Sequence, residues 1–125
     1  FAGMNLNNSN QADIARAMIE GMLAGLADAV DALIALGVKV NRILLIGGAA
    51  KNPAIPTIAS ALFGREVLVP PAGEYVADGA AKQAAWALLG EMPTWDLGNV
   101  SHHESKATPH VMDKYRTLRD NTATW

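Results

Sequence analysis

The segment Arg42–Ile46, with the sequence RILLI, runs directly into the glycine pair Gly47 and Gly48 and, five residues later, reaches Pro53. A nearly continuous apolar run is typical of a strand that is covered on both faces, as in a parallel sheet. Glycine permits a sharp turn after such a strand, and proline is tolerated in the first turn of a helix. The segment therefore predicts a central strand, a tight turn and a following helix.

Helical segments are predicted on both sides of this strand. Asn10 and Asp13 have the spacing of a helix N-cap, and helix-forming residues continue to about residue 36. Apolar residues recur at helical spacing over 53–63, and an alanine-rich helix is predicted over 74–89. Glycines suited to helix C-caps follow the three segments at Gly37, Gly64 and Gly90.

A second strand is predicted at Glu66–Val69, between the second and third helical segments. The order helix–strand–helix–strand–helix indicates an α/β fold with parallel strands joined by right-handed crossovers. Two strands alone are marginally stable, so we expect further strands of the sheet to lie outside this sequence. Residues 91–125 are more polar and show little periodicity. We interpret 1–90 as one subdomain and 91–125 as a polar docking tail.

The first predicted helix carries more apolar surface than one small sheet can cover. Its charged residues fall on one stripe, whereas a broad apolar surface is centred on Met18, Met22, Leu26 and Leu33. Large exposed apolar patches are uncommon on monomers, and unpaired strand edges recruit other chains. We therefore expect self-association, such as a homodimer. The methionines are otherwise expected to fill gaps in the core; they are Met4, Met18, Met22, Met92 and Met112.

Composition excludes several classes of function. The 125 residues carry a net charge of −2 without a long basic cluster, which argues against nucleic-acid binding. The absence of cysteine excludes disulfides and thiolate metal sites and favours a reducing, cytoplasmic location. Charges interrupt the apolar runs, and no signal peptide is recognisable, so we expect no membrane partner. His102, His103 and His110 lack metal-ligand spacing, which favours a solvated loop.

The glycine pair after the first strand has two possible roles. Ligands of open α/β sheets collect at the carboxyl ends of strands, where free backbone amides can approach a nucleotide. The spacing, however, matches neither a P-loop nor a GxGxxG fingerprint. The alternative is that the glycines only permit the turn and that Asn52 caps the next helix. Lys51 and Arg16 have a similar ambiguity, because each could contact phosphate or simply face water.

Three segments in this order resemble the carboxy-terminal part of FGGY-family carbohydrate kinases over about residues 3–90. They are Gly3–Leu6 through Arg16–Gly21, then Ile43–Asn52, then Gly73–Ala81. The resemblance implies an actin-like ATPase fold of the ribonuclease H type, with ATP and a sugar as substrates and Mg²⁺ held mainly through the nucleotide. It also implies that the nucleotide lies against Gly47, Gly48 and Ala49, and that Asn52 reaches the adenine.

The resemblance also implies residues that this sequence does not contain. In the family, an aspartate of an amino-terminal domain acts as the catalytic base, and no segment here corresponds to it. We therefore assign no catalytic residue and no metal ligand, and expect this chain alone to be inactive, because phosphoryl transfer needs both substrates, metal and base positioned together. The alternative is a non-catalytic, actin-like module for binding or assembly.

Overall fold

The computed structural model describes residues 2–123, and it begins with the long helix α1, Gln11–Ala35. The Asn10 side chain accepts a hydrogen bond from the Asp13 N–H at 3.0 Å, which caps the first turn. Gly37 has a φ of +89° just beyond the last turn, a conformation that glycine adopts without a steric penalty. The predicted start and end of this helix are confirmed.

The strand–turn–helix unit follows α1. Strand β1, Ile43–Leu44, leads through the short 3₁₀ helix η1, Gly48–Lys51, into helix α2, Ala54–Phe63. Strand β2, Val67–Val69, then pairs parallel with β1, so that Ile43 lies opposite Val67. The parallel pairing and the helix between the strands are as predicted, although both strands are shorter than predicted and η1 was not foreseen.

The sheet is mixed, because a third strand comes from the carboxy-terminal segment. Strand β3, Ser101–His103, pairs antiparallel with β2 and gives the strand order β1-β2-β3. The prediction that the first strand is central is therefore wrong for the described residues, since β2 holds that place. After helix α3, Tyr75–Leu89, the chain returns and places β3 beside β2. This pairing was not predicted, because the segment that forms β3 is polar.

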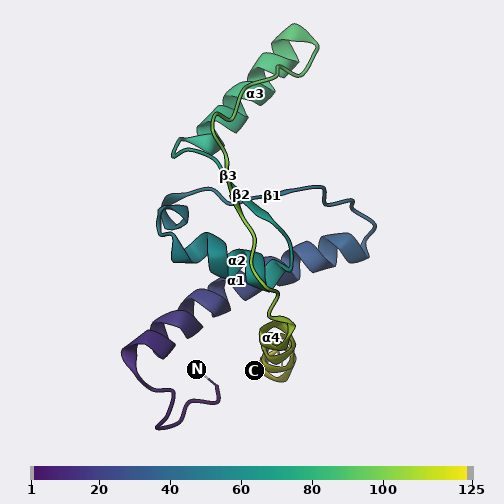
Figure 1. Cartoon of the computed structure of the whole chain (residues 1–125). Helices are drawn as coiled ribbons and strands as arrows, with labels where there is room; N and C mark the ends of the chain where they lie inside the picture. Colours follow the sequence, from purple (N-terminus) through teal and green to yellow (C-terminus); the bar gives the residue numbers. More distant parts are fainter. Residues whose placement is uncertain (1, 124–125) are drawn as a thin grey trace.

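The core lies between α1, α2 and one side of the sheet, and helix α4, Pro109–Thr122, closes it from the carboxy-terminal side (Figure 1). Apart from one methionine, its members are small or branched apolar residues, of which Leu23, Ala59 and Val67 are at most 1% exposed. Met112 of α4 is the buried methionine. The prediction that the methionines fill the core is wrong for the others, which are exposed; they are Met4, Met18, Met22 and Met92.

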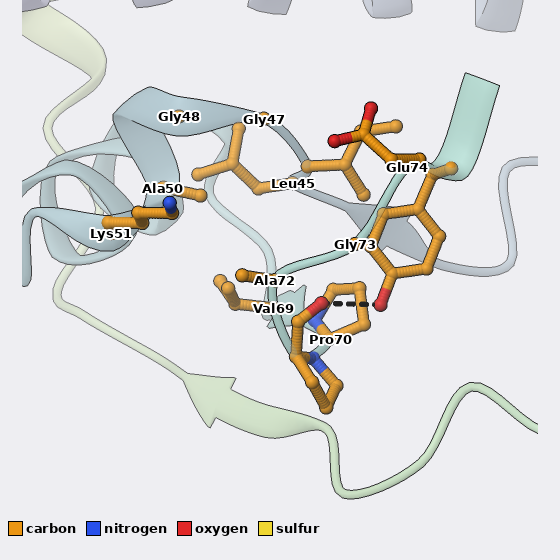
Figure 2. Close-up of a pocket in the computed structure, with 13 residues that line it drawn as sticks. Leu45, Gly47, Gly48, Ala50, Lys51, Val69, Pro70, Ala72, Gly73 and Glu74 are labelled. Atoms are coloured by element: carbon orange, nitrogen blue, oxygen red, sulfur yellow. Dashed lines mark hydrogen bonds between the residues drawn. The ribbon is translucent and has the colours of Figure 1, made fainter. Parts of the chain in front are cut away.

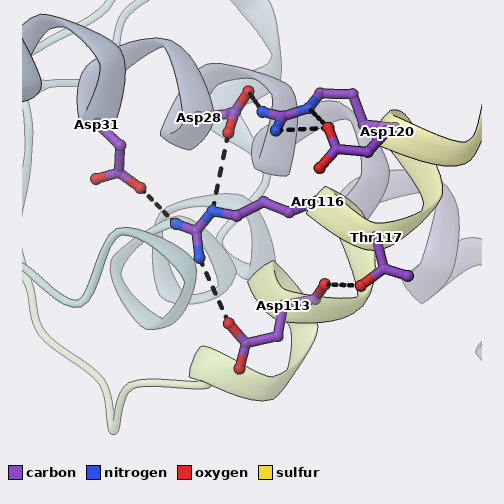
Figure 3. A network of polar contacts seen from close by, with 7 residues as sticks. Asp28, Asp31, Asp113, Arg116, Thr117 and Asp120 are labelled. Carbon is purple, nitrogen blue, oxygen red and sulfur yellow. Dashed lines mark hydrogen bonds and ion pairs between the residues drawn. The ribbon is translucent and has the colours of Figure 1, made fainter. Parts of the chain in front are cut away.

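Helix α4 is held on α1 by apolar contacts and by charged pairs. The Arg116 guanidinium lies 2.7 Å from an Asp31 carboxylate oxygen, and Arg119 pairs with Asp28 (Figure 3). The hydrogen bond to Asp28, and to a lesser extent the one to Asp120, raises the pKa of Arg119 above its usual value. The carboxylates of α1 therefore face the arginines of α4, and residues 91–123 contribute both a strand and a helix to the fold.

Helix α3 projects away from the rest of the molecule (Figure 1). None of its residues is buried, and Val76 and Leu88 are among its exposed apolar side chains. Because α3 does not pack on the second face of the sheet, that face is uncovered. This explains why β1 is only half-buried and Ile46 is exposed. The expectation of a first strand covered on both faces does not hold in this structure.

Candidate functional site

A cleft opens where the parallel strands β1 and β2 both end. It has a volume of about 540 Å³, within the range of small-molecule sites. One wall is the turn after β1, with Leu45–Gly48, Ala50 and Lys51, and the other is the turn after β2, Val69–Tyr75 (Figure 2). The two turns meet because parallel pairing brings the carboxyl ends of both strands to the same edge.

The glycine pair gives the first wall its shape. Gly47 has φ +101° and ψ 176°, a conformation that is accessible essentially to glycine alone. Gly48 has no such constraint, and a Cβ placed on it would meet no atom within 4 Å. The turn role predicted for Gly47 is therefore seen, whereas Gly48 presents bare backbone to open space in the cleft.

Asn52 lies at the far end of η1, and the cleft is not lined by it or by Ala49. The Asn52 Oδ1 accepts a hydrogen bond from the Ala54 N–H at 3.0 Å, so Asn52 satisfies the first N–H of α2 from the position before Pro53, which is the N-cap residue. This bond uses the side-chain oxygen and leaves the side-chain NH₂ as a donor. Of the four residues expected at the nucleotide, the structure thus brings Gly47 and Gly48 into the cleft.

The second wall was not found by sequence reasoning. The Tyr75 hydroxyl donates a hydrogen bond to the Pro71 carbonyl at 2.5 Å, drawn as the dashed line in Figure 2. The Tyr75 ring lies over Gly73, because a Cβ built there would be 3.5 Å from two ring carbons. The sequence indicated this wall only indirectly. Because the second predicted strand was expected to run parallel to the first, the turn that follows it must lie at the same edge of the sheet.

The charges at the cleft are few. Lys51 of the first wall and Glu74 of the second are the charged side chains among the lining residues, and the remainder is apolar, glycine or tyrosine. Arg16, the other candidate for phosphate contact, pairs with Glu20 on α1 at 2.7 Å and does not line this cleft. Such a surface suits a largely uncharged ligand that places an anionic group near Lys51.

The histidines lie away from the cleft. His102 and His103 belong to β3, so the expectation of a loop there is wrong. The His102 Nδ1 is 2.8 Å from a Glu66 carboxylate oxygen, and the His103 Nε2 is 3.0 Å from the Ser101 hydroxyl. Over residues 2–123, no group of three or more histidine, aspartate or glutamate side chains has an arrangement suited to a metal ion. In the same range, none of the helices has the length and apolar character needed to cross a membrane.

The chain belongs to the FGGY family of carbohydrate kinases, because residues 1–88 match that family's C-terminal domain. This membership agrees with the α/β architecture of the structure and confirms the resemblance carried by the three sequence segments.

Within the family, the chain is similar in sequence to xylulose kinases and to a ribulokinase. The chain is 32% identical to a xylulose kinase of Streptomyces coelicolor over 108 residues, which is 86% of this chain and 22% of that protein. It is 36% identical to a ribulokinase of Vibrio parahaemolyticus over 92 residues, or 73% of this chain and 16% of that protein. The crystal structure of a xylulose kinase from Bifidobacterium adolescentis superposes with a TM-score of 0.76 at 42% identity, over 95% of this chain and 24% of that one. This chain thus spans about a quarter or less of the length of these relatives.

Proposed function

We propose that this chain is the ATP-binding, carboxy-terminal part of a sugar kinase most like xylulose kinase. The whole enzyme would transfer the γ-phosphoryl group of ATP to D-xylulose, with ADP and D-xylulose 5-phosphate as products. The observation that carries the proposal is the cleft at the carboxyl ends of β1 and β2, in a chain of the FGGY family. The 42% identity to a xylulose kinase supports the choice of sugar.

The nucleotide would lie along the first wall, against Gly47 and Gly48, and would extend past the lining residues to Ala49 and Asn52 of the same turn. The bare backbone of Gly48 supports this placement, because nothing lies within 4 Å of the position that a Cβ would take there. The Asn52 NH₂ would donate to a ring nitrogen of the adenine while its oxygen continues to accept from the Ala54 N–H. Lys51 would lie toward the phosphates, because it is the cation among the lining residues.

Mg²⁺ would be held by the nucleotide phosphates rather than by this chain. Magnesium sites in kinases commonly combine substrate phosphates, waters and one or two carboxylates. The cleft offers Glu74 as its carboxylate, which is compatible with a metal held mainly by phosphate oxygens. When bound, the ion would neutralise charge on the transferring phosphoryl group.

The base and the sugar pocket would belong to other parts of the enzyme, so we expect the isolated chain not to phosphorylate sugar. The enzyme would be cytoplasmic, where ATP and free sugar meet. Self-association is part of the proposal because Met18 and Met22 on α1 are 63% and 53% exposed.

Nucleotide titration with three asparagine variants tests the adenine assignment. Asn52→Ala removes the bond to the Ala54 N–H and the donor, whereas Asn52→Asp keeps an acceptor for that N–H, removes the donor and adds a negative charge. Loss of one hydrogen bond to the base corresponds to about 1 kcal/mol, or roughly fivefold weaker ATP binding, since water competes for both groups. Asn41→Ala is the matched control, because Asn41 lies at the opposite, amino-terminal end of β1. Unchanged ATP affinity in both Asn52 variants would remove Asn52 from the site.

Sugar identity is tested by a coupled assay on a kinase that contains this chain. D-Xylulose should be preferred over D-ribulose in kcat/KM. A preference for ribulose would instead favour a function like that of the Vibrio relative, and phosphoryl transfer to neither sugar would favour the non-catalytic alternative.

A further inference from the structure

The second wall of the cleft is an exposed turn that needs something to hold it in place. Pro70 is buried at its start and Tyr75 is half-buried at its end, whereas residues 71–74 between them are exposed. Pro70 and Pro71 have no N–H group, so neither can donate a backbone hydrogen bond that ties the turn to the sheet. Neither burial nor backbone hydrogen bonds from these prolines therefore fix the middle of this wall.

Tyr75 closes the turn on itself. Its hydroxyl donates to the Pro71 carbonyl at 2.5 Å, which links the first residue of α3 to the second proline (Figure 2). Its ring covers Gly73, with two ring carbons 3.5 Å from the place of a Cβ. One side chain thus contacts the turn at two points and also lines the cleft.

The carboxy-terminal segment supports the same turn from behind. A Cβ built on Gly98 would lie 3.4 Å from the Pro71 Cγ, so the returning chain passes close to the proline ring. Gly98 has a φ of +71° and its N–H donates to the Asp96 side chain at 2.9 Å, which fixes the local path of the segment. Pro71 is therefore contacted at its ring by the segment around Gly98 and at its carbonyl by the Tyr75 hydroxyl.

We propose that Tyr75 is a positioning residue for adenine-nucleotide binding, which it serves by holding the Pro70–Glu74 turn at a fixed distance from Gly48 across the cleft. This inference rests on the proposed function, because it assumes that the nucleotide occupies the space between the two walls. The nucleotide would then be bound by a first wall shaped by Gly47 and a second wall set by the bond from Tyr75 to Pro71. Without that bond, the turn would sample wider positions and the contacts with the nucleotide would weaken.

Tyr75→Phe is the decisive variant, because it keeps the ring over Gly73 and removes the hydroxyl alone. We expect ATP to bind roughly 3- to 10-fold more weakly, as for the loss of one hydrogen bond. Amide hydrogen exchange without nucleotide should become faster in peptides that cover residues 70–76. The melting temperature should change little, since the bond is exposed and the core is untouched. Tyr115→Phe, on the α1-facing side of α4, is the matched control and should leave ATP affinity and this exchange unchanged.

The outcomes separate this inference from the function on which it rests. If the unsubstituted chain binds ATP and Tyr75→Phe binds it equally well, only the role of Tyr75 is refuted. Unchanged exchange in residues 70–76 would show that the hydroxyl does not hold the turn, and would also refute it. If the unsubstituted chain binds no adenine nucleotide, the proposed function fails and the inference fails with it.

Discussion

Gly47 and Gly48 are adjacent, yet the structure predicts opposite consequences for the same substitution at the two positions. Gly47 has φ +101° and ψ 176°, and holding an alanine in such a backbone conformation costs about 1–3 kcal/mol. Gly48 has no positive φ, and an alanine Cβ there would meet no protein atom within 4 Å. Gly48→Ala should therefore be neutral for folding, or stabilising by about 0.4–1 kcal/mol through the unfolded state.

Binding should reverse this order. A methyl group on Gly48 projects from the wall along which we place the nucleotide, so Gly48→Ala should weaken ATP binding without loss of stability. Gly47→Ala should lower the melting temperature by roughly 4 °C for each kcal/mol of strain in a domain of this size. The measurements are thermal unfolding of both variants and ATP titration well below their melting temperatures.

Two results would refute this reasoning. Equal loss of stability in the two variants would mean that the backbone conformation of Gly47 does not account for its identity. ATP affinity unchanged by Gly48→Ala, in a chain that binds ATP, would mean that the nucleotide does not approach this backbone.

Four further predictions concern packing, ion pairing, assembly and activity. Met112→Ala should lower the free energy of unfolding by about 2–5 kcal/mol, because Met112 is 4% exposed in the core. Arg116→Ala should lower the free energy of unfolding by about 1 kcal/mol or less, with a larger effect at low salt, because the ion pairs of Arg116 are exposed. Urea unfolding measures the stability of both variants. A larger loss for Arg116→Ala than for Met112→Ala would show that charge rather than apolar packing holds α4. Light scattering at micromolar concentration should show self-association that Met22→Glu reduces, and a stable monomer before substitution would contradict it. The purified chain should show no xylulose phosphorylation in a coupled assay with ATP and Mg²⁺, and turnover above background would require a catalytic base among its own residues.

The helices could be predicted from the sequence because their ends depend on local chemistry. Asn10 caps α1 through an atom three residues away, and Gly64 and Gly90 adopt positive φ directly after α2 and α3. Strand order could not be predicted in the same way. The pairing of Leu68 with His102 joins residues far apart in the sequence, and the polar β3 has no apolar alternation to indicate it.

The two walls of the candidate site differ in the same way, because one could be predicted from local sequence and the other could not. The first wall follows from one continuous motif, in which an apolar strand precedes Gly47 and Gly48. The second wall follows only from three-dimensional pairing, since Pro70–Tyr75 reaches the cleft because β2 lies parallel to β1. The exposed α1 surface was foreseen from its pattern, whereas the exposure of α3 was not, because an alanine-rich helix gives no sign of the side from which it is covered.

The chemistry of the two walls indicates which part of the nucleotide they would hold. Phosphoryl transfer requires positive charge around the transferring group, usually from metal ions together with lysine or arginine side chains. The lining residues offer Lys51 as their cation, and Glu74 opposes it from the second wall. Their other members are glycines, prolines, aliphatic side chains and the ring of Tyr75, which suit an uncharged base and ribose. Under the proposed function, adenosine would therefore lie between the walls with the edge of its base extending toward Asn52, and the γ-phosphate would extend beyond them toward groups that supply the missing charge. The two tasks of such a kinase would then be divided in space: this cleft would fix the nucleotide, and the electrostatics of transfer would be provided elsewhere in the enzyme.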